Sequence, residues 1–391
     1  MNKIPQKNII DGIVFESPVY LDKNYILLTP EIPVSEDLRK NLSNWEYREL
    51  LTDGAIEGRE SMNKGESTIS SAFLDHDAKE HEGLKEARLF YTEILDSVEK
   101  MYLRYSRDKH LDLNNITEQI KKMISMIKDH HDYILRLPDL DSYNKEYLIT
   151  HSVKCALLAL TIGESMKMPN FKLIELGISA LLHEIGMLKL PDNLYNFQRQ
   201  LSDSEKKALT THTILGYRLL KEFPLSQDVL MGVLQHHEKN DGSGYPQQLT
   251  VNKISDYAKI ISVVCAYDAQ ITDRPHSRSR DGYHTLMEML KGVGTIYDET
   301  ALKTLVYSIS IFPLGSHVVL ENGSVGIVVH TNKENPKYPI VKLLVDKDQN
   351  ALRDQPVIET RDENGFKILN ILEESEKKKL EEKGIFNNSI T

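Results

Sequence analysis

Residues 147–166, YLITHSVKCALLALTIGESM, decide how the rest of the chain is interpreted. Apolar side chains and one histidine recur there every three or four residues, which is the spacing of one face of an α-helix. That face carries Tyr147, His151, Cys155, Leu158, Ile162 and Met166. His151 is therefore expected to point into the protein interior.

Four further predicted helices repeat this arrangement. The ligand-type residues on or beside their apolar stripes are His183 and Glu184, then His212, then His236 and His237, and finally Asp268. A single histidine on an apolar face is usually a hydrogen-bonded core residue, and a buried carboxylate is costly unless it is paired or bound to metal. Such residues on five consecutive helices are better explained by one metal cluster than by separate structural roles.

The donor set indicates the kind of metal. Nitrogen and oxygen donors from seven residues exceed the capacity of one tetrahedral zinc ion, and two iron or manganese ions bridged by a carboxylate suit the set better. We interpret Cys155 and Cys265 as buried free thiols that take no part in the cluster. The zincin motif HExxH is excluded, because Met187 stands where its second histidine would be.

Changes in sequence pattern along the chain predict a mainly helical fold with small modules at both ends. We expect an α+β module over 1–53 (strands 12–15, 19–20 and 25–28, helix 35–43), a polar linker over 54–83, a helical region over 84–142, the catalytic helical bundle over 143–312, a β module over 313–372 and a charged tail over 373–391.

Composition limits the class of protein. The 48 lysine and arginine residues against 58 aspartate and glutamate residues give a net charge of −10, which argues against a protein that coats DNA, RNA or anionic membranes through bulk charge. No apolar run reaches the roughly 18 residues of a membrane helix, and the first residues lack the apolar segment of a secretory signal. A cytoplasmic location is expected.

The order of the motifs resembles the HD-GYP family, the metal-dependent branch of the HD superfamily that hydrolyses the bacterial messenger cyclic di-GMP. The resemblance covers about residues 144–311. Its markers are His151-Ser152, His183-Glu184-Ile185-Gly186 with Leu190-Pro191-Asp192, His212 with Gly216, His236-His237-Glu238 with Asp241-Gly242-Ser243-Gly244-Tyr245-Pro246, and Tyr267-Asp268-Ala269 with Asp273-Arg274-Pro275.

The resemblance implies roles for these residues. His151, His183, Glu184 and Asp268 would hold one metal, and Glu184, His212, His236 and His237 a second, with Glu184 as the bridge and a water between the ions as the nucleophile. Glu184 and Asp268 would thus be catalytic. The expected substrate contacts are Arg274 to a phosphate, the loop Gly244, Tyr245 and Pro246 around guanine, and Lys189 and Arg278. The product would be pGpG, GMP or both.

The chain departs from the family pattern at four places. Glu184 replaces the aspartate of the His-Asp pair, Met187 replaces a phosphate-contacting lysine, Tyr147 replaces a glutamate of members with a third metal, and His276-Ser277 follow Arg274-Pro275 in place of Tyr-Arg. Two alternatives therefore stay open. One is a degenerate module that binds metal or nucleotide and signals to a partner protein, and the other is a hydrolase of another nucleotide. Whether the chain forms a homodimer is also open.

Overall fold

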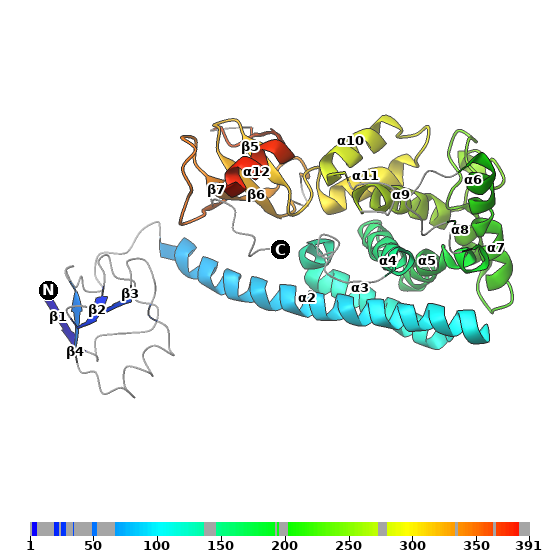
Figure 1. The fold of residues 1–391 in the computed structure, drawn as a ribbon, viewed down its shortest axis with the longest axis horizontal. Helices are drawn as coiled ribbons and strands as arrows, with labels where there is room; N and C mark the ends of the chain where they lie inside the picture. Colours follow the sequence, from blue (N-terminus) through cyan, green and yellow to red (C-terminus); the bar gives the residue numbers. More distant parts are fainter. Residues whose placement is uncertain are drawn as a thin grey trace. The chain divides into compact units, whose positions relative to one another are not determined.

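The computed structural model describes residues 2–5, 19–22, 25–28, 34, 49–52, 67–136, 146–191, 194, 202–272, 280–332, 335–362 and 365–382 (Figure 1). The chain divides into two compact units, Met1–Glu82 and Gly83–Thr391. No described helix is both long and apolar enough to cross a membrane.

The first unit contains a four-stranded antiparallel sheet. Its strands are β1 (Asn2–Pro5), β2 (Val19–Asp22), β3 (Tyr25–Leu28) and β4 (Glu49–Thr52), in the spatial order β1-β4-β2-β3. The predicted strand at 12–15 and the predicted helix at 35–43 lie outside the described residues.

The structure differs from the expected linker over 54–83. Helix α2 (Ser67–Asp108) begins inside this stretch. Residues 67–82 contain neither glycine nor proline, and their alanine, lysine and glutamate residues favour a helix even though they offer little apolar surface. The low apolar content therefore indicated a solvated segment but did not distinguish a linker from a helix.

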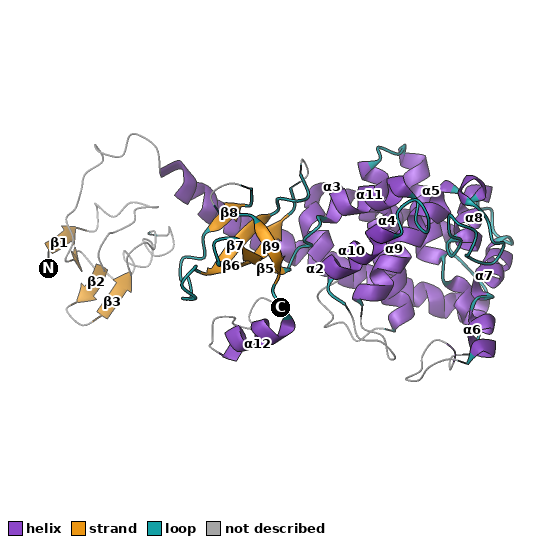
Figure 2. Cartoon of the chain, turned by 90° about the horizontal axis from the view of Figure 1, so that it is seen from above, coloured by secondary structure: helices purple, strands orange, loops and turns teal. Residues whose placement is uncertain are grey.

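The second unit is dominated by packed helices (Figure 2). After α2 come α3 (Leu113–Arg136), α4 (Tyr147–Ser165), α5 (Asn170–Leu182), the short 3-10 helix η3 (Ile185–Lys189), α6 (Asp203–Leu209), α7 (His212–Leu220), α8 (Gln227–Gln235), α9 (Asp256–Ile271), α10 (Gly282–Lys291) and α11 (Glu299–Ile309). Helix α4 contacts α3, α5, α9 and α11, and every residue from His151 to Gly163 is buried. A helix that is buried on all sides belongs at the centre of a bundle.

A five-stranded antiparallel sheet lies at one end of this bundle. Its strands are β5 (His317–Leu320), β6 (Val325–His330), β7 (Ile340–Val345), β8 (Val357–Glu359) and β9 (Ile368–Ile371), in the order β8-β7-β6-β5-β9, and α12 (Glu374–Glu382) follows. Strands β5 and β6 pair through a turn that contains Gly323 at φ 87°. The expected fold class, mainly helical with small modules at both ends, is confirmed.

Candidate metal centre

Most of the predicted ligands lie at helix ends. Helix α5 ends at Leu182, so that His183 and Glu184 follow it at the turn into η3, and α8 ends at Gln235, directly before His236 and His237. Between α6 and α7, the hydroxyls of Thr210 and Thr211 donate hydrogen bonds to the carbonyls of Lys207 and Ala208. His212 is consequently the first residue of α7.

The structure brings these side chains together in the interior. Six are buried, namely His151, His183, Glu184, His212, His236 and Asp268, and His237 is half-buried. Donor atoms of Glu184, His212, His236 and His237 all lie within 4.8 Å of one another. A second group within the same limit contains His151, His183, Glu184 and Cys265. Glu184 belongs to both groups, as expected for a bridging residue, although its role as a ligand stays a prediction.

Backbone carbonyls fix the tautomers of three histidines. The Nδ1 atoms of His183, His212 and His236 each lie 2.7 Å from the carbonyl oxygen of the residue three positions earlier. A carbonyl oxygen can only accept, so each Nδ1 carries the proton. In the neutral rings each Nε2 is then an acceptor, and this pattern is how metal-binding histidines are usually oriented.

Acceptor atoms consequently face one another without a donor between them. His212 Nε2 lies 3.2 Å from His236 Nε2 and 3.4 Å from Glu184 Oε2. Among the described residues, no group forms a hydrogen bond with His183 Nε2 or Glu184 Oε2, although both atoms are buried. Buried acceptors at these distances are costly without a cation, so the donor set fits divalent metal.

The protonation states agree with this interpretation. Burial and the neighbouring imidazoles lower the pKa of His236 well below its usual value, and burial lowers the pKa of His237 to about 4. Burial alone would raise the pKa of the Glu184 carboxyl, but His212 and His183 hold it below its usual value. The neutral imidazoles of His236 and His237 and the ionised carboxylate of Glu184 are the forms that bind metal.

Asp268 contacts the cluster through His151. Its Oδ2 accepts a 2.6 Å hydrogen bond from His151 Nδ1, and Oδ1 accepts one of 3.0 Å from the Thr272 hydroxyl. The ammonium of Lys154, buried in α4, donates to that hydroxyl at 3.1 Å. Burial would lower the pKa of His151, but the bond to Asp268 raises it to about 10, so a metal bound at Nε2 must displace a proton. Lys154 and Thr272 were not identified from the sequence.

The loop after His237 brings an aromatic ring to the cluster. Glu238 is buried, and its carboxylate accepts hydrogen bonds from the backbone amides of Gln247 at 2.6 Å and Leu249 at 2.9 Å. At Gly244 a Cβ atom would lie 2.4–2.5 Å from the backbone of residues 237–239, so only glycine fits there. Tyr245 stacks on His237 with ring centroids 4.7 Å apart, and Pro246 follows it through a cis peptide bond.

Sequence reasoning left both cysteines out of the cluster. They are free and buried, as expected, but Cys265 lies with the ligand group of His151, and Cys155 lies with His151 and Asp268. Hydrogen bonds from Cys155 and His151 hold the pKa of the Cys265 thiol well below its usual value, although burial opposes this. The signal was in the sequence, since Cys155 and Cys265 share helix faces with His151 and Asp268.

Of the three other expected substrate contacts, the structure describes only Lys189. Arg274 and Arg278 lie outside the described residues. Lys189 is exposed at the end of η3, and Met187 is buried in the main core.

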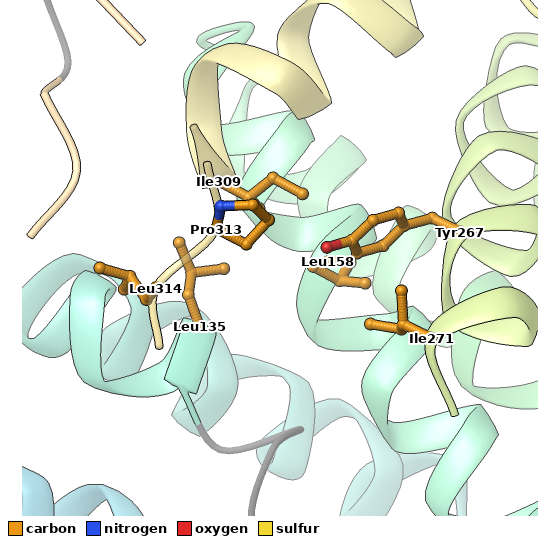
Figure 3. A pocket seen from close by; sticks show the side chains of 7 residues that line it. All are labelled: Leu135, Leu158, Tyr267, Ile271, Ile309, Pro313 and Leu314. Carbon is orange, nitrogen blue, oxygen red and sulfur yellow. The ribbon is translucent and has the colours of Figure 1, made fainter. Parts of the chain in front are cut away.

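A small apolar cavity is drawn in Figure 3. It is lined by Leu135, Leu158, Tyr267, Ile271, Ile309, Pro313 and Leu314 and has a volume of about 30 Å³. Binding pockets for drug-sized ligands measure roughly 300–1,000 Å³. This cavity is therefore too small for a nucleotide, and the buried histidine cluster is the better candidate for the functional site.

Comparison with known proteins agrees with this choice. Residues 137–301 match the family model of the HD domain, and residues 317–380 match that of a KOW domain associated with HD domain. All seven predicted ligands fall within the first match.

Two curated relatives carry the same description. Cyclic di-GMP phosphodiesterase PdeB of Borreliella burgdorferi is 27% identical over 330 residues, which cover 80% of this chain and 87% of that protein. Cyclic di-GMP phosphodiesterase PA4108 of Pseudomonas aeruginosa is 27% identical over 263 residues, which cover 67% of this chain and 63% of that protein. Among solved structures, Bd1817, an HDG"Y"P protein from Bdellovibrio bacteriovorus, aligns with a TM-score of 0.47 and 16% identity over 78% of this chain and 97% of that chain.

Proposed function

We propose that this chain, which belongs to the HD-GYP branch of the HD superfamily, is a metal-dependent phosphodiesterase that hydrolyses cyclic di-GMP to pGpG, GMP or both. The observation that carries the proposal is the 3.2 Å approach of His212 Nε2 to His236 Nε2, while the Nδ1 atom of each ring donates to a backbone carbonyl. Two buried acceptors at this distance call for a cation.

The donors fall into two overlapping groups that suit two ions. His151, His183, Glu184 and Asp268, which bonds His151, would hold one. Glu184, His212, His236 and His237 would hold the other. Two divalent cations, iron or manganese, would supply a nucleophilic hydroxide at neutral pH and carry charge that develops on the phosphoryl oxygens. Glu184 would bridge the two ions, since it is the one residue that both groups share.

The remaining residues would position the ligands and the substrate. Asp268, braced by Thr272 and Lys154, would keep the ring of His151 in one orientation. Tyr245, stacked on His237, offers a flat apolar surface for a guanine base beside the cluster. Arg274 would contact a phosphate of the substrate, with Lys189 and Arg278 as further cations.

The experiment combines metal analysis with turnover. Purified protein is loaded anaerobically with Fe(II) or with Mn(II) and incubated with cyclic di-GMP, and the products are separated by chromatography. The matched pair of variants is His183→Ala, inside the cluster, and His284→Ala, whose side chain is exposed and bonds Asp281 at the start of α10. We expect His183→Ala to lose metal and turnover, and His284→Ala to keep both.

Two outcomes would contradict the proposal. Bound metal without turnover of any cyclic dinucleotide would favour the signalling module, which Glu184 and Met187 suggest because both depart from the family pattern. Turnover of another cyclic dinucleotide, with cyclic di-GMP left intact, would keep the enzyme class and change the substrate.

A further inference from the structure

A buried tyrosine of α2, a helix that carries no predicted ligand, reaches the backbone beside the metal centre. The hydroxyl of Tyr102 lies 3.2 Å from the Ser152 hydroxyl in α4 and 3.2 Å from the Leu181 carbonyl oxygen in α5. Ser152 follows His151 directly, and Leu181 lies two positions before His183. A single hydroxyl thus joins the two segments that carry His151 and His183.

The direction of both hydrogen bonds follows from the groups involved. A carbonyl oxygen can only accept, so the Tyr102 hydroxyl donates its one proton to Leu181. Tyr102 therefore accepts its second hydrogen bond from the Ser152 hydroxyl. Burial raises the pKa of the Tyr102 phenol well above its usual value, so the phenol keeps the proton that it donates. The chain from Ser152 through Tyr102 to Leu181 consequently runs in one direction.

The bond to Leu181 holds the end of α5. The last four carbonyls of a helix have no amide partner within that helix, and Leu181 lies in the last turn of α5. Side chains take two of these carbonyls, because Ala180 accepts from His183 Nδ1 at 2.7 Å and Leu181 accepts from Tyr102. Leu181 is only 1% exposed, so loss of the Tyr102 hydroxyl would leave a buried acceptor where solvent does not reach. Tyr102 thereby fixes the helix end that leads into His183 and Glu184.

The first metal is the ion that His151, His183, Glu184 and Asp268 would hold. We infer that Tyr102 is a positioning residue for this first metal, because its hydroxyl sets the separation between the backbone at His151 and the backbone at His183. This inference rests on the proposed metal centre. Within the described part of the chain, the hydroxyl bonds α4 and α5 but neither α7 nor α8. The first metal should therefore depend on Tyr102, and the second should not.

Binding of Mn(II) to the full chain tests this inference, because free Mn(II) gives an electron paramagnetic resonance signal that is lost on binding. Tyr102→Phe removes the hydroxyl and keeps the ring. We expect it to weaken one of the two Mn(II) ions about 10- to 100-fold, as for other residues that orient a ligand, and to leave the affinity for the other unchanged. Tyr105→Phe is the matched control, because Tyr105 is buried one turn further along α2 and its hydroxyl makes no hydrogen bond to a described residue.

Three measurements distinguish positioning from a general contribution to stability. A merely structural role would lower the melting temperature of the metal-free Tyr102→Phe protein and leave its Mn(II) affinity unchanged. Ser152→Ala should weaken the same ion, and the double variant with Tyr102→Phe should bind it no more weakly than Tyr102→Phe alone, because the two hydroxyls act in one chain. In a His237→Ala background, which lacks a ligand of the second metal, Tyr102→Phe should weaken the ion that remains.

The outcomes separate this inference from the proposed function. Wild-type Mn(II) affinity in Tyr102→Phe, or equal weakening by Tyr105→Phe, would overturn the inference and leave the metal centre standing. Equal weakening of both ions would overturn the assignment to the first metal. A wild type that binds neither Mn(II) nor Fe(II) would overturn both proposals. If Tyr102→Phe does not fold, Ser152→Ala decides, since it keeps the bond to Leu181, and wild-type affinity in that variant would overturn the inference.

Discussion

Gly186 in η3 lies so close to the backbone of His212 in α7 that a Cβ atom on it would be 2.0 Å from the His212 carbonyl oxygen. The same atom would lie 2.6 Å from the amide nitrogen of Gly216. Two glycines at the crossing thus let η3 and α7 approach each other, which brings Glu184, just before η3, to within 3.4 Å of His212 Nε2.

Replacing Gly186 by alanine tests this crossing. The overlap is with backbone, which side-chain movement cannot relieve, so Gly186→Ala should cost about 2–3 kcal/mol of stability and separate Glu184 from His212. Thermal unfolding and bound-metal analysis would measure both effects. The control is Gly292→Ala, where the atoms nearest to a Cβ belong to the Ile296 side chain, at 3.2–3.4 Å, and not to backbone. Equal effects of the two substitutions would contradict the proposed role of the crossing.

Asp132 in α3 links the helical bundle to the C-terminal sheet. Its carboxylate accepts from Thr331 at 3.0 Å and bonds His131 at 2.9 Å and His330 at 3.3 Å. Burial opposes ionisation, but these partners lower the pKa of Asp132 well below its usual value. Its contribution to stability is therefore complete above the unfolded pKa of about 3.9 and is lost as the pH falls below it.

The prediction concerns the difference in melting temperature between wild type and Asp132→Asn. That difference should shrink from about pH 4 downward, because the unfolded carboxylate takes up a proton there while the native carboxylate stays ionised to lower pH. Asp129→Asn is the matched control, because Asp129 lies exposed on the same helix, where it accepts a hydrogen bond from Ser125 one turn away. A wild-type advantage that persists unchanged at low pH would show that Asp132 contributes through shape and not through charge.

The sequence predicted which residues lie together in the interior, but not which hydrogen bonds they form with one another. Helical spacing was sufficient to place His151, His183, His212 and Asp268 in the interior, since periodicity reports which face is buried. It could not show that Asp268 bonds His151 Nδ1, because the two residues are 117 positions apart and their distance depends on how α4 packs against α9.

Local chemistry at helix ends was equally hard to predict. The adjacent pair His236 and His237 required a helix to end there, and α8 does end at Gln235. By contrast, the buried carboxylate of Glu238 that anchors the loop to Tyr245 had no periodic signal, because it sits in a turn. The sulfur of Cys265 was overlooked because a thiol on an apolar stripe is usually a core residue.

His237 tests the second donor group. His237→Ala removes one of four donors that include His212 and His236, and it also removes the ring on which Tyr245 stacks. We expect about one fewer equivalent of metal per chain and loss of turnover. Tyr245→Ala separates the two effects, since it should retain metal and raise KM for cyclic di-GMP. Full metal content in His237→Ala would remove this residue from the second group.

The departures at Glu184 and Met187 allow a test of whether the site has adapted or decayed. Glu184 reaches His212 Nε2 at 3.4 Å and His151 Nε2 at 4.0 Å, and aspartate, which is about 1.5 Å shorter, would lose at least one of these contacts. A displacement of this size can cost about a hundredfold in rate. Glu184→Asp should therefore lower metal content and activity.

Replacing Met187 by lysine, the residue of the family pattern, is expected to lower the stability of the fold. Its side chain is 8% exposed and packs in the main core, so Met187→Lys would bury an unpaired charge and destabilise the fold by about 3 kcal/mol or more. Met187→Leu, which nearly conserves volume, is the control and should cost less than about 1.5 kcal/mol.

The double reversion Glu184→Asp with Met187→Lys should accordingly be less active and less stable than the wild type. If the wild type binds two metals without measurable hydrolysis, and the double variant gains at least about tenfold in rate, the site is a decayed enzyme and the adapted-site interpretation is wrong.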